Sequence, residues 1–390
     1  MARLGDVGLV ITGNTPKTSE PQNYESNDIC FVKPSDIIDG TVSYLDKSEF
    51  YISEHARAKA RILPPKSVLV TCIGIIGKVA INNVECAFNQ QINAIIPDDS
   101  KCLTEYLAYA IQNKQPEMQD VANAPVVPIL NKTQFSDIEI NLPSLTEQEE
   151  IVEKLNAVSR LIALRKEQLA KLDQLVKSRF IELFGDPMEN PMGWDRVNIS
   201  AVVGGKVSNG FFAKRDDYCD DGNVKVLGVA HVVNRMYSNV EDLPITNGTE
   251  ADVAKYGVKY GDMLFCRSSL VAAGIGKASI VPKDTPNNVL FECHVIRLPL
   301  ALNKCVPEFM QVLSTTDYFR NQVIAQSKTA TMTTIGQDGI LKTDIILPPL
   351  ELQKQFLKFV EQTDKSKLAI QQSLDKLETL KKSLMQEYFG

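Results

Sequence analysis

Two glycine-rich segments, each ending in a lysine, come nearest to a phosphate-binding motif in this 390-residue chain. They are Gly74–Lys78 and Gly274–Lys277. A nucleotide-hydrolysing P-loop needs Ser or Thr directly after the lysine, whereas Val79 and Ala278 stand there. Nucleotide hydrolysis is therefore excluded. Two alternatives remain for both segments: a turn whose amides and lysine hold a DNA phosphate, or a plain tight turn between strands.

Other catalytic patterns are also incomplete. The acidic residues of Asp98–Lys101 are adjacent in one hydrophilic turn, so no separate acid is present to share a nuclease metal. Asn190–Met192 lacks the second proline and the aromatic residue of an adenine methyltransferase motif. The eight cysteines form no C-x-x-C pair, and there are only three histidines. We therefore predict no catalytic residues, no metal site and no cofactor bound by this chain.

The composition is that of an ordinary globular protein, with 44% apolar and 23% charged residues. No apolar run is long enough to cross a membrane, no signal peptide is recognisable, and scattered cysteines suit buried free thiols, so we expect a cytoplasmic protein. The net charge of −6 argues against a nucleic-acid binder. Residues 1–140 carry 12 basic and 17 acidic residues, and residues 186–342 carry 16 and 17.

Polar and cationic residues nevertheless gather in short segments of both halves. Amides such as those of Asn89–Gln91 can read adenine edges bidentately, and His55–Arg61 is the densest cationic stretch of the first half. We expect Arg57, Lys59 and Arg61 to share a strand face or to fan out from a helix. A solvated surface loop is the alternative for each segment. The candidate DNA-binding residues are Asn14, Thr15, Lys17, Lys33, Arg57, Lys59, Arg61, Lys78, Asn89, Gln90, Gln91, Lys214, Arg215, His231, Arg267, Ser268, Lys277, Lys328 and Thr331.

The chain is an internal repeat. Ile140–Gln148 matches Ile345–Gln353 at an offset of 205, and the match continues without a gap to Phe184-Gly185 and Phe389-Gly390. Each half is thus a variable segment followed by a similar helical one. We therefore predict a pseudo-two-fold molecule within one chain.

The repeated segments are predicted to be long helices. The pattern Thr146-x-x-Glu149 suggests a capping box at the start of the first, and apolar residues then follow a heptad frame over five heptads. Because both copies belong to one pseudo-symmetric chain, we expect them to pair as an antiparallel coiled coil. A pair of core helices in an ordinary domain is the alternative. The predicted seam residues are Leu155, Ile162, Leu169, Val176, Ile370, Leu374, Leu377 and Leu384.

The variable segments carry short β-branched apolar runs separated by Gly, Asn, Asp and Pro, which predicts mostly β domains. Short helices are expected at Thr104–Gln112 and Pro307–Leu313, and a linker at 186–193. The predicted fold class is α+β: two mixed, mostly β domains separated by two long helices. The predicted parts are domain one at 1–140, helical spacer one at 141–185, domain two at 186–342 and helical spacer two at 343–390.

This order of parts resembles the specificity subunit of type I restriction-modification systems. The resemblance covers the whole chain and rests on I-x-L-P-x-L-x-x-Q followed by a long helix ending in F-G, written twice. Gly13–Pro16, Gly74–Lys78 and Asn89–Gln91 resemble features of the family's first target-recognition domain. The second half departs from the pattern, because Gly210–Phe212 replaces the G-x-T-P turn and Glu292–His294 replaces the amide triplet.

The resemblance implies a non-catalytic chain that reads an asymmetric, bipartite double-stranded DNA target, one half-site per target-recognition domain. It implies two DNA methyltransferase subunits that bind S-adenosylmethionine and methylate adenine, and motor-nuclease subunits that use ATP and Mg to cleave unmodified DNA in phage defence. One alternative is a DNA-recognition subunit of a related modification or phage-defence assembly without a nuclease. Another is a pseudo-symmetric coiled-coil scaffold that touches no DNA.

Overall fold

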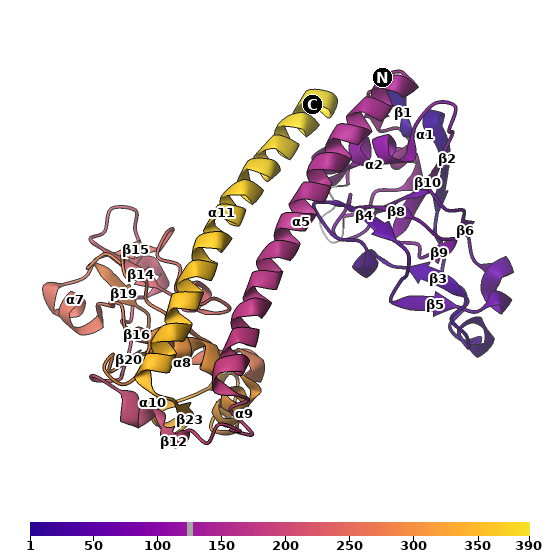
Figure 1. The fold of residues 1–390 in the computed structure, drawn as a ribbon. Coiled ribbons are helices and arrows are strands. Elements are labelled where there is room, and N and C mark those ends of the chain that lie inside the picture. The colour runs from indigo at the N-terminus through magenta and orange to yellow at the C-terminus, as the bar shows by residue number, and fades with distance from the viewer. Residues whose placement is uncertain (123–127) are drawn as a thin grey trace. The chain divides into compact units, whose positions relative to one another are not determined.

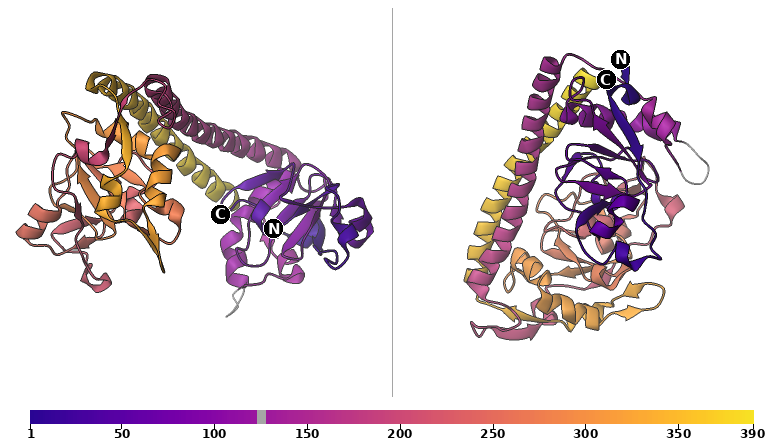
Figure 2. Two further views of the ribbon diagram at one scale, coloured as in Figure 1. Left: turned by 90° about the horizontal axis from the view of Figure 1, so that it is seen from below. Right: turned by 90° about the vertical axis from the view of Figure 1, so that its right-hand side faces the viewer.

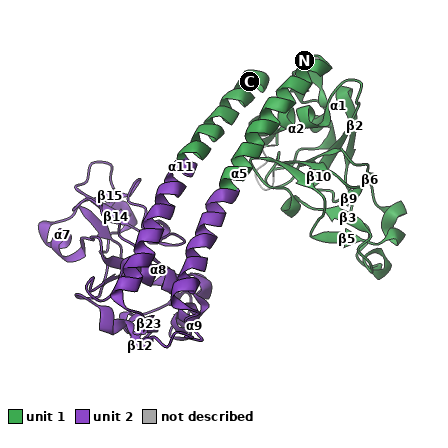
Figure 3. Ribbon diagram, viewed as in Figure 1, with its two compact units in different colours: residues 1–166, 372–390 green, residues 167–371 purple. Residues whose placement is uncertain are grey.

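The computed structural model describes residues 1–122 and 128–390 (Figure 1). The chain divides into two compact units, and each contains part of both long helices (Figure 3). Unit 1 comprises Met1–Lys166 and Gln372–Gly390, and unit 2 comprises Glu167–Gln371. None of the helices in these described ranges is long and apolar enough to span a membrane.

Unit 1 is built on a five-stranded sheet. In spatial order its strands are β2 (Gly8–Thr12), β10 (Ile92–Pro97), β7 (Val68–Thr71), β8 (Val79–Asn82) and β4 (Val42–Leu45). Neighbours are antiparallel except β4 and β8, which are parallel. Every residue of β7 and β8 is buried, which explains why these segments are continuous apolar runs rather than alternating patterns.

A second sheet of unit 1 carries the polar loops. It is formed by β5 (Phe50–Ile52), β3 (Ile29–Val32), β9 (Cys86–Phe88) and β6 (Ile62–Leu63), with β3 and β9 parallel. A short pair joins β1 (Ala2–Arg3) to β11 (Glu139–Ile140). The helices are α1 (Leu4–Val7), α2 (Thr104–Asn113), α3 (Gln115–Val121) and α4 (Lys132–Ser136), and the 3-10 turns are η1 (Pro21–Asn23), η2 (Pro34–Asp36) and η3 (Glu54–Lys59).

Unit 2 repeats this plan with smaller sheets. A four-stranded sheet has the order β13 (Ser208–Asn209), β20 (Val295–Pro299), β16 (Asp262–Cys266), β18 (Ala278–Ile280). Two three-stranded sheets follow the orders β15 (Ile245–Thr246), β14 (Val224–Leu227), β19 (Val289–Phe291) and β17 (Ser268–Ser269), β22 (Thr333–Thr334), β21 (Lys328–Thr329). The parallel pair β14 and β19 corresponds to β3 and β9 of unit 1.

The remaining elements of unit 2 connect and cover these sheets. The short pair β12 (Asp195–Asn198) and β23 (Asp344–Leu347) corresponds to β1 and β11. The helices are α6 (Val229–Val232), α7 (Glu250–Tyr256), α8 (Pro307–Ser314), α9 (Asp317–Ala325) and α10 (Gln337–Leu341), and the 3-10 turns are η4 (Ile199–Val202), η5 (Arg215–Asp217) and η6 (Ala272–Gly274). The helices expected at Thr104–Gln112 and Pro307–Leu313 are therefore confirmed as α2 and α8.

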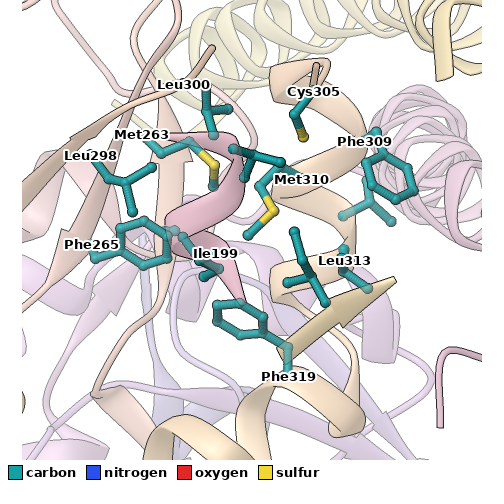
Figure 4. Close-up of a cluster of buried hydrophobic side chains, with 14 of the residues drawn as sticks. Ile199, Met263, Phe265, Leu298, Leu300, Cys305, Phe309, Met310, Leu313 and Phe319 are labelled. Atoms are coloured by element: carbon teal, nitrogen blue, oxygen red, sulfur yellow. The ribbon is translucent and has the colours of Figure 1, made fainter. Parts of the chain in front are cut away.

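Helix α8 forms the centre of the unit 2 core. Met310 and Leu313 face the sheet residues Met263 and Phe265, and Phe319 of α9 closes the cluster (Figure 4). The rings of Phe265 and Phe319 stack with centroids 6.3 Å apart. Burying such side chains removes apolar surface from water and is the main source of stability for the unit.

The two long helices are α5 (Leu145–Phe184) and α11 (Leu350–Phe389), each of 40 residues, and their bounds keep the repeat offset of 205. They lie side by side in all views (Figures 1 and 2). In unit 1, Lys154 of α5 meets Tyr388 and Lys166 pairs with Glu378 at 2.9 Å. In unit 2, Asp173 pairs with Lys367 at 2.6 Å. The early part of one helix thus meets the late part of the other, as antiparallel pairing requires.

The start of α5 corrects one prediction. The capping box involves Ser144 and Glu147, not Thr146 and Glu149. The Ser144 hydroxyl and N–H both donate to the Glu147 carboxylate, and the Glu147 N–H donates back to the hydroxyl at 3.4 Å. The helix therefore begins directly after Ser144 and includes Thr146 in its first turn.

Candidate nucleic-acid interface

The turn at Gly13 packs directly against the amide triplet in unit 1. The Asn14 N–H donates to the Phe88 carbonyl at 3.0 Å, and the Gly13 N–H to the Ile92 carbonyl at 3.1 Å. A Cβ atom at position 13 would lie only 2.1 Å from the Asn89 carbonyl oxygen. Only glycine permits this approach, so the turn and the triplet form one rigid unit.

The side chains of this turn and triplet hold one another. The Thr15 hydroxyl donates to Gln90 Oε1 at 2.6 Å, and Asn89 Nδ2 donates to Gln91 Oε1 at 2.9 Å. Asn89 is buried, Gln91 is half-buried and Gln90 is exposed. Gln90 therefore presents an oriented amide to solvent, and Asn89 acts as a support for Gln91.

Of the three cations in the His55–Arg61 segment, Arg57 and Lys59 lie on η3 and Arg61 follows it, and the charges of the first two are paired. Arg57 pairs with Glu54 and, at 2.7 Å, with Glu85. Lys59 pairs with Glu20 at 2.8 Å, and its ammonium group holds the pKa of that carboxyl below its usual range. This stretch is therefore largely neutralised within the unit.

Arg61 and Asn14 tie this segment to the glycine turn. The Arg61 guanidinium donates to the Thr12 carbonyl, and the Arg61 N–H donates to Asn14 Oδ1 at 2.8 Å. Asn14 Nδ2 in turn donates to the Lys59 carbonyl at 2.7 Å. The predicted residues of 14–17, 57–61 and 89–91 are thus brought together at one edge of unit 1.

The other three predicted DNA-binding lysines of unit 1 differ in how free their ammonium groups are to bind a phosphate. Lys78 Nζ donates to the carbonyls of Pro34 and Ile37 at 3.2 and 3.0 Å, so its ammonium is already engaged within the unit. Lys33 Nζ lies 3.1 Å from the centroid of the Phe50 ring. Lys17 is exposed, and its ammonium makes no hydrogen bond or ion pair within the described residues. Lys17 is therefore the most accessible cation of the six.

Unit 2 builds the same backbone framework from different side chains. A Cβ at Gly210 would lie 2.2 Å from the carbonyl oxygens of Phe291 and Glu292, as at Gly13. The Phe211 N–H donates to the Phe291 carbonyl at 2.7 Å, which matches the bond from Asn14 to Phe88. Similarly, Arg267 N–H donates to the His294 carbonyl and Cys72 N–H to the Gln91 carbonyl, both at 2.8 Å.

At the triplet position, unit 2 has a carboxylate in place of an amide. Glu292 Oε1 accepts a hydrogen bond of 2.7 Å from the Val229 N–H at the start of α6. The Gly228 N–H donates to His231 Nδ1 at 3.0 Å, which fixes the ring of His231 beside this site. Phe212, which replaces Thr15, is 67% exposed. The second framework therefore has an exposed aromatic ring at the place of Thr15 and a half-buried carboxylate at the place of the buried Asn89.

The small sheet β17-β22-β21 unites two predicted segments that lie about sixty residues apart. Ser268 pairs with Thr334, Thr334 pairs with Lys328, and the Ile335 N–H donates to the Arg267 carbonyl at 3.0 Å. Lys328 and Thr331 are exposed. Sequence analysis missed two flanking apolar residues, Leu270 and Val271, which are 83% and 62% exposed. No sequence signal distinguishes them from core residues.

The remaining predicted cations of unit 2 differ in their contacts. Lys214 and Arg215 are exposed at η5, where the Asp217 carboxylate accepts a 2.7 Å bond from the Lys214 N–H. Lys277 is half-buried, and its ammonium donates to Asn234 Oδ1 at 2.7 Å. Arg267 Nη1 donates to the Cys293 carbonyl at 3.2 Å, which places it beside the triplet position.

The predicted seam residues occupy the least exposed stripe of each long helix. Leu155, Val176 and Leu374 are buried, at 0%, 4% and 5% exposure. The other seam residues are half-buried: Ile162, Leu169, Ile370, Leu377 and Leu384. Leucines outside the frame, such as Leu164 at 44% and Leu368 at 62%, face solvent.

Two glutamines that sequence analysis did not select attach the long helices to their units. Gln148 is completely buried and donates to the carbonyls of Lys101 and Pro143 at 3.0 and 2.9 Å. Gln353 is equally buried and donates to Lys304 and Pro348. The signal that could have identified these glutamines is their equivalent position in both repeats.

Catalytic groups are not assembled in the described part of the chain. No cluster of three or more His, Cys, Asp or Glu residues there is placed to hold a metal ion. All eight cysteines are free thiols. Burial raises the pKa of Cys72 to about 11 and that of Cys102 to about 12, which is opposite to the activation of a nucleophile.

Comparisons with known proteins agree with this arrangement. Residues 1–174 and 191–381 each match the family described as type I restriction modification DNA specificity domain. The chain is 28% identical to the MjaIX specificity subunit of Methanocaldococcus jannaschii over 59% of its own length and 57% of that protein, so the match spans little more than half of that relative. It is 22% identical to the EcoKI specificity subunit of Escherichia coli over 100% of this chain and 88% of that one.

A solved structure shares the fold. The type I restriction-modification S subunit from M. genitalium superimposes with a TM-score of 0.56 over 100% of this chain and 95% of that chain, at 11% sequence identity. Two β-rich domains and two long paired helices are therefore common to both. The two family matches together cover nearly the whole sequence. The chain belongs to the type I restriction-modification DNA specificity family, within which it is a non-catalytic DNA specificity subunit.

Proposed function

We propose that this chain reads an asymmetric, bipartite DNA target, with one half-site for each of the domains at 1–140 and 186–342. The helical segments at 141–185 and 343–390 then set the unread spacer. The observation that carries this proposal is that both units hold the same turn and triplet framework with different side chains on it. Two domains that recognise different base sequences in the same way need a shared framework with different contact residues.

The different side chains on the turn and triplet of each unit support different half-sites. An oriented glutamine such as Gln90 can donate to and accept from an adenine edge. A carboxylate such as Glu292 can accept from cytosine, and exposed apolar groups such as Phe212 can contact a thymine methyl group. The two domains should therefore prefer unrelated bases.

The long helices supply a length for the spacer. A helix of 40 residues extends about 60 Å at roughly 1.5 Å per residue. At one base pair per roughly 3.4 Å, that caps the separation of the two half-sites at about 17 base pairs. About one turn of the duplex between the half-sites is the more natural spacing.

The charge of the chain indicates that other subunits supply most of the affinity. The net charge is −6, and Arg57 and Lys59 are already paired with carboxylates. Phosphate contacts dominate the affinity of most DNA-binding proteins, so the isolated chain should bind weakly. We assign that role to two methyltransferase subunits holding S-adenosylmethionine, which enclose the duplex in the cytoplasm. Motor-nuclease subunits that use ATP and Mg join the same assembly.

A methylome of the host, read base by base with the gene intact and deleted, tests this function. One asymmetric split motif should lose adenine methylation on deletion. Exchange of residues 1–140 for the corresponding domain of another family member should then change one half of the motif and leave the other half and the spacer unchanged. An unchanged methylome in a strain whose methyltransferase is active would favour a scaffold that does not touch DNA.

A further inference from the structure

A cavity of 420 Å³ in unit 2 has cations as all but one of its charged lining residues. It lies among α5, α8, α9, α11 and the loop after α6. The charged residues on its described walls are Asp173, Lys177, Arg235, Lys277, Arg320 and Lys367. Five positive charges thus face a single carboxylate in a chain whose net charge is −6.

Most of these charges are not compensated by the protein. The one carboxylate, Asp173, pairs with Lys367 at 2.6 Å. Lys277 donates to the neutral amide of Asn234, and Arg235 donates to backbone carbonyls at 3.4 Å. Neither these two residues nor Arg320 forms an ion pair with any residue that the structure describes. Such a group of like charges is unfavourable without an anion.

Arg320 carries the clearest sign of a missing partner. Its Nη2 donates to the Ala273 carbonyl at 3.1 Å, whereas its Nη1 is buried and has no hydrogen-bond partner among the described residues. Burial also lowers the pKa of this guanidinium. A buried donor without a partner is rare in proteins, and an anion in the cavity would satisfy it.

One residue that lines the cavity differs between the two repeats. Leu103 and Val306 are equivalent, because each donates its N–H to the buried glutamine of its repeat. Tyr109 of α2 and Val312 of α8 each lie six residues further on and are therefore equivalent as well. In unit 1 the Tyr109 ring is buried and its hydroxyl donates to Asn156 at 2.7 Å. In unit 2 the smaller side chain of Val312 lines the cavity.

We propose that this cavity binds one compact anion that carries several phosphate groups, of the size of a triphosphate. The unpartnered Nη1 of Arg320 suits a phosphate oxygen as a charged hydrogen-bond donor, and the lysines act as point charges. The cations come from both long helices and from the domain, so they surround one volume and do not follow a row as along a duplex. A bound anion would therefore hold α5 and α11 to the domain within unit 2.

Isothermal titration of the purified full chain with tripolyphosphate, and separately with ATP, tests the proposal. We expect saturable binding of one anion per chain and a higher melting temperature when the anion is present. Arg235→Gln combined with Lys277→Gln should weaken binding at least tenfold. Lys177→Glu, at an exposed position on the rim, should do the same without disturbing the fold. Lys358→Gln, exposed on α11 outside the cavity, is the matched control and should bind as the unmodified chain does.

Three results would overturn the proposal. One is the absence of saturable binding by either anion. Another is an equal loss of affinity in Lys358→Gln and in the cavity variants, which would indicate nonspecific charge attraction. The third is a failure of both anions to bind while the cavity variants weaken duplex DNA binding by the assembled complex. That outcome would assign the cations to a DNA backbone phosphate, and it leaves the proposed target recognition intact.

Discussion

The side-chain carbonyl of Gln148 accepts a hydrogen bond of 2.9 Å from the backbone N–H of Leu103, which joins the start of α5 to the start of α2. Gln353 repeats this bond with Val306 at 2.8 Å in unit 2. Both glutamines are completely buried. Each also satisfies two carbonyl groups, so one amide fixes the angle at which each long helix leaves its domain.

Replacement of Gln353 by leucine should destabilise unit 2. The Val306 N–H and two carbonyls would remain buried without partners, at a cost of about 1–3 kcal/mol in the free energy of unfolding. Urea denaturation followed by circular dichroism measures this loss. Gln362→Leu, at an exposed position of the same helix, should change the midpoint little. Equal midpoints for the two variants would contradict a role for the buried amide.

Glu308 makes the stability of unit 2 depend on pH. Its carboxyl is completely buried and accepts hydrogen bonds of 3.1 Å from the hydroxyls of Tyr237 and Tyr260, and burial raises its pKa. Because the folded chain binds this proton more tightly than the unfolded chain, the free energy of unfolding falls as pH rises from about 4.5 toward the raised folded value.

Glu308→Gln should reduce this pH dependence, of which Asp262 and Asp364 keep a part, and should make unit 2 more stable than the parent above that window. Thermal melting between pH 4.5 and pH 8 measures the slope. Glu105 holds the equivalent place on α2 but is only half-buried, so Glu105→Gln is the control and should leave the slope unchanged. A slope that is equally steep in Glu308→Gln would assign the dependence to another group.

Leu169→Asp should weaken the pairing of the long helices. Leu169 lies on the half-buried stripe of α5 that faces α11. A carboxylate there would lose the apolar contacts of leucine and part of its own hydration, which should lower the free energy of unfolding by about 1–3 kcal/mol. The helical signal at 222 nm during urea denaturation measures the change, and assembly with partner subunits should be lost as well. Leu164→Asp, five residues earlier and 44% exposed, provides the comparison. An active complex that carries Leu169→Asp would refute the heptad frame.

Replacement of Gln90 and Gln91 by alanine should relax recognition in one half-site only. Each lost bidentate contact should reduce discrimination by about 1–3 kcal/mol. Binding of the assembled complex to duplexes altered in one half or the other measures the effect. Replacement of Cys293 and His294 by alanine is the matched change in unit 2 and should affect the opposite half. Equal effects on both halves would contradict the assignment of one half-site to each domain.

The long helices and the β-rich domains could be predicted because local pattern determines them. The repeat offset of 205 defines both ends of α5 and α11, and the β-branched runs became the buried strands of both sheets. The helix start was misplaced by two residues because Ser144–Glu147 and Thr146–Glu149 both fit a capping box, and the structure forms the first.

The candidate site was harder to predict because its contacts join distant segments. Lys59 and Glu20 are separated by 39 residues, and nothing in the local sequence shows that they pair. Ser268 pairs with Thr334 in a three-stranded sheet. Each strand of this sheet has only two residues, which is too short to show a strand pattern in the sequence. The polar loops could be predicted from their residue types. Which of their charges are neutralised could be seen only in the folded structure.

Because Gly13 and Gly210 pack closely against backbone atoms, the displayed side chains can change over evolutionary time without a change in the position of the loop. Each glycine meets backbone carbonyl oxygens, so the position of the loop does not depend on the side chains displayed by the facing triplet. New side chains can therefore be tried at 89–91 or 292–294 without rebuilding the loop that presents them. A lineage under pressure to alter its recognised motif can therefore change these few positions, whereas a single methyl group added at either glycine would clash with the backbone and displace the loop.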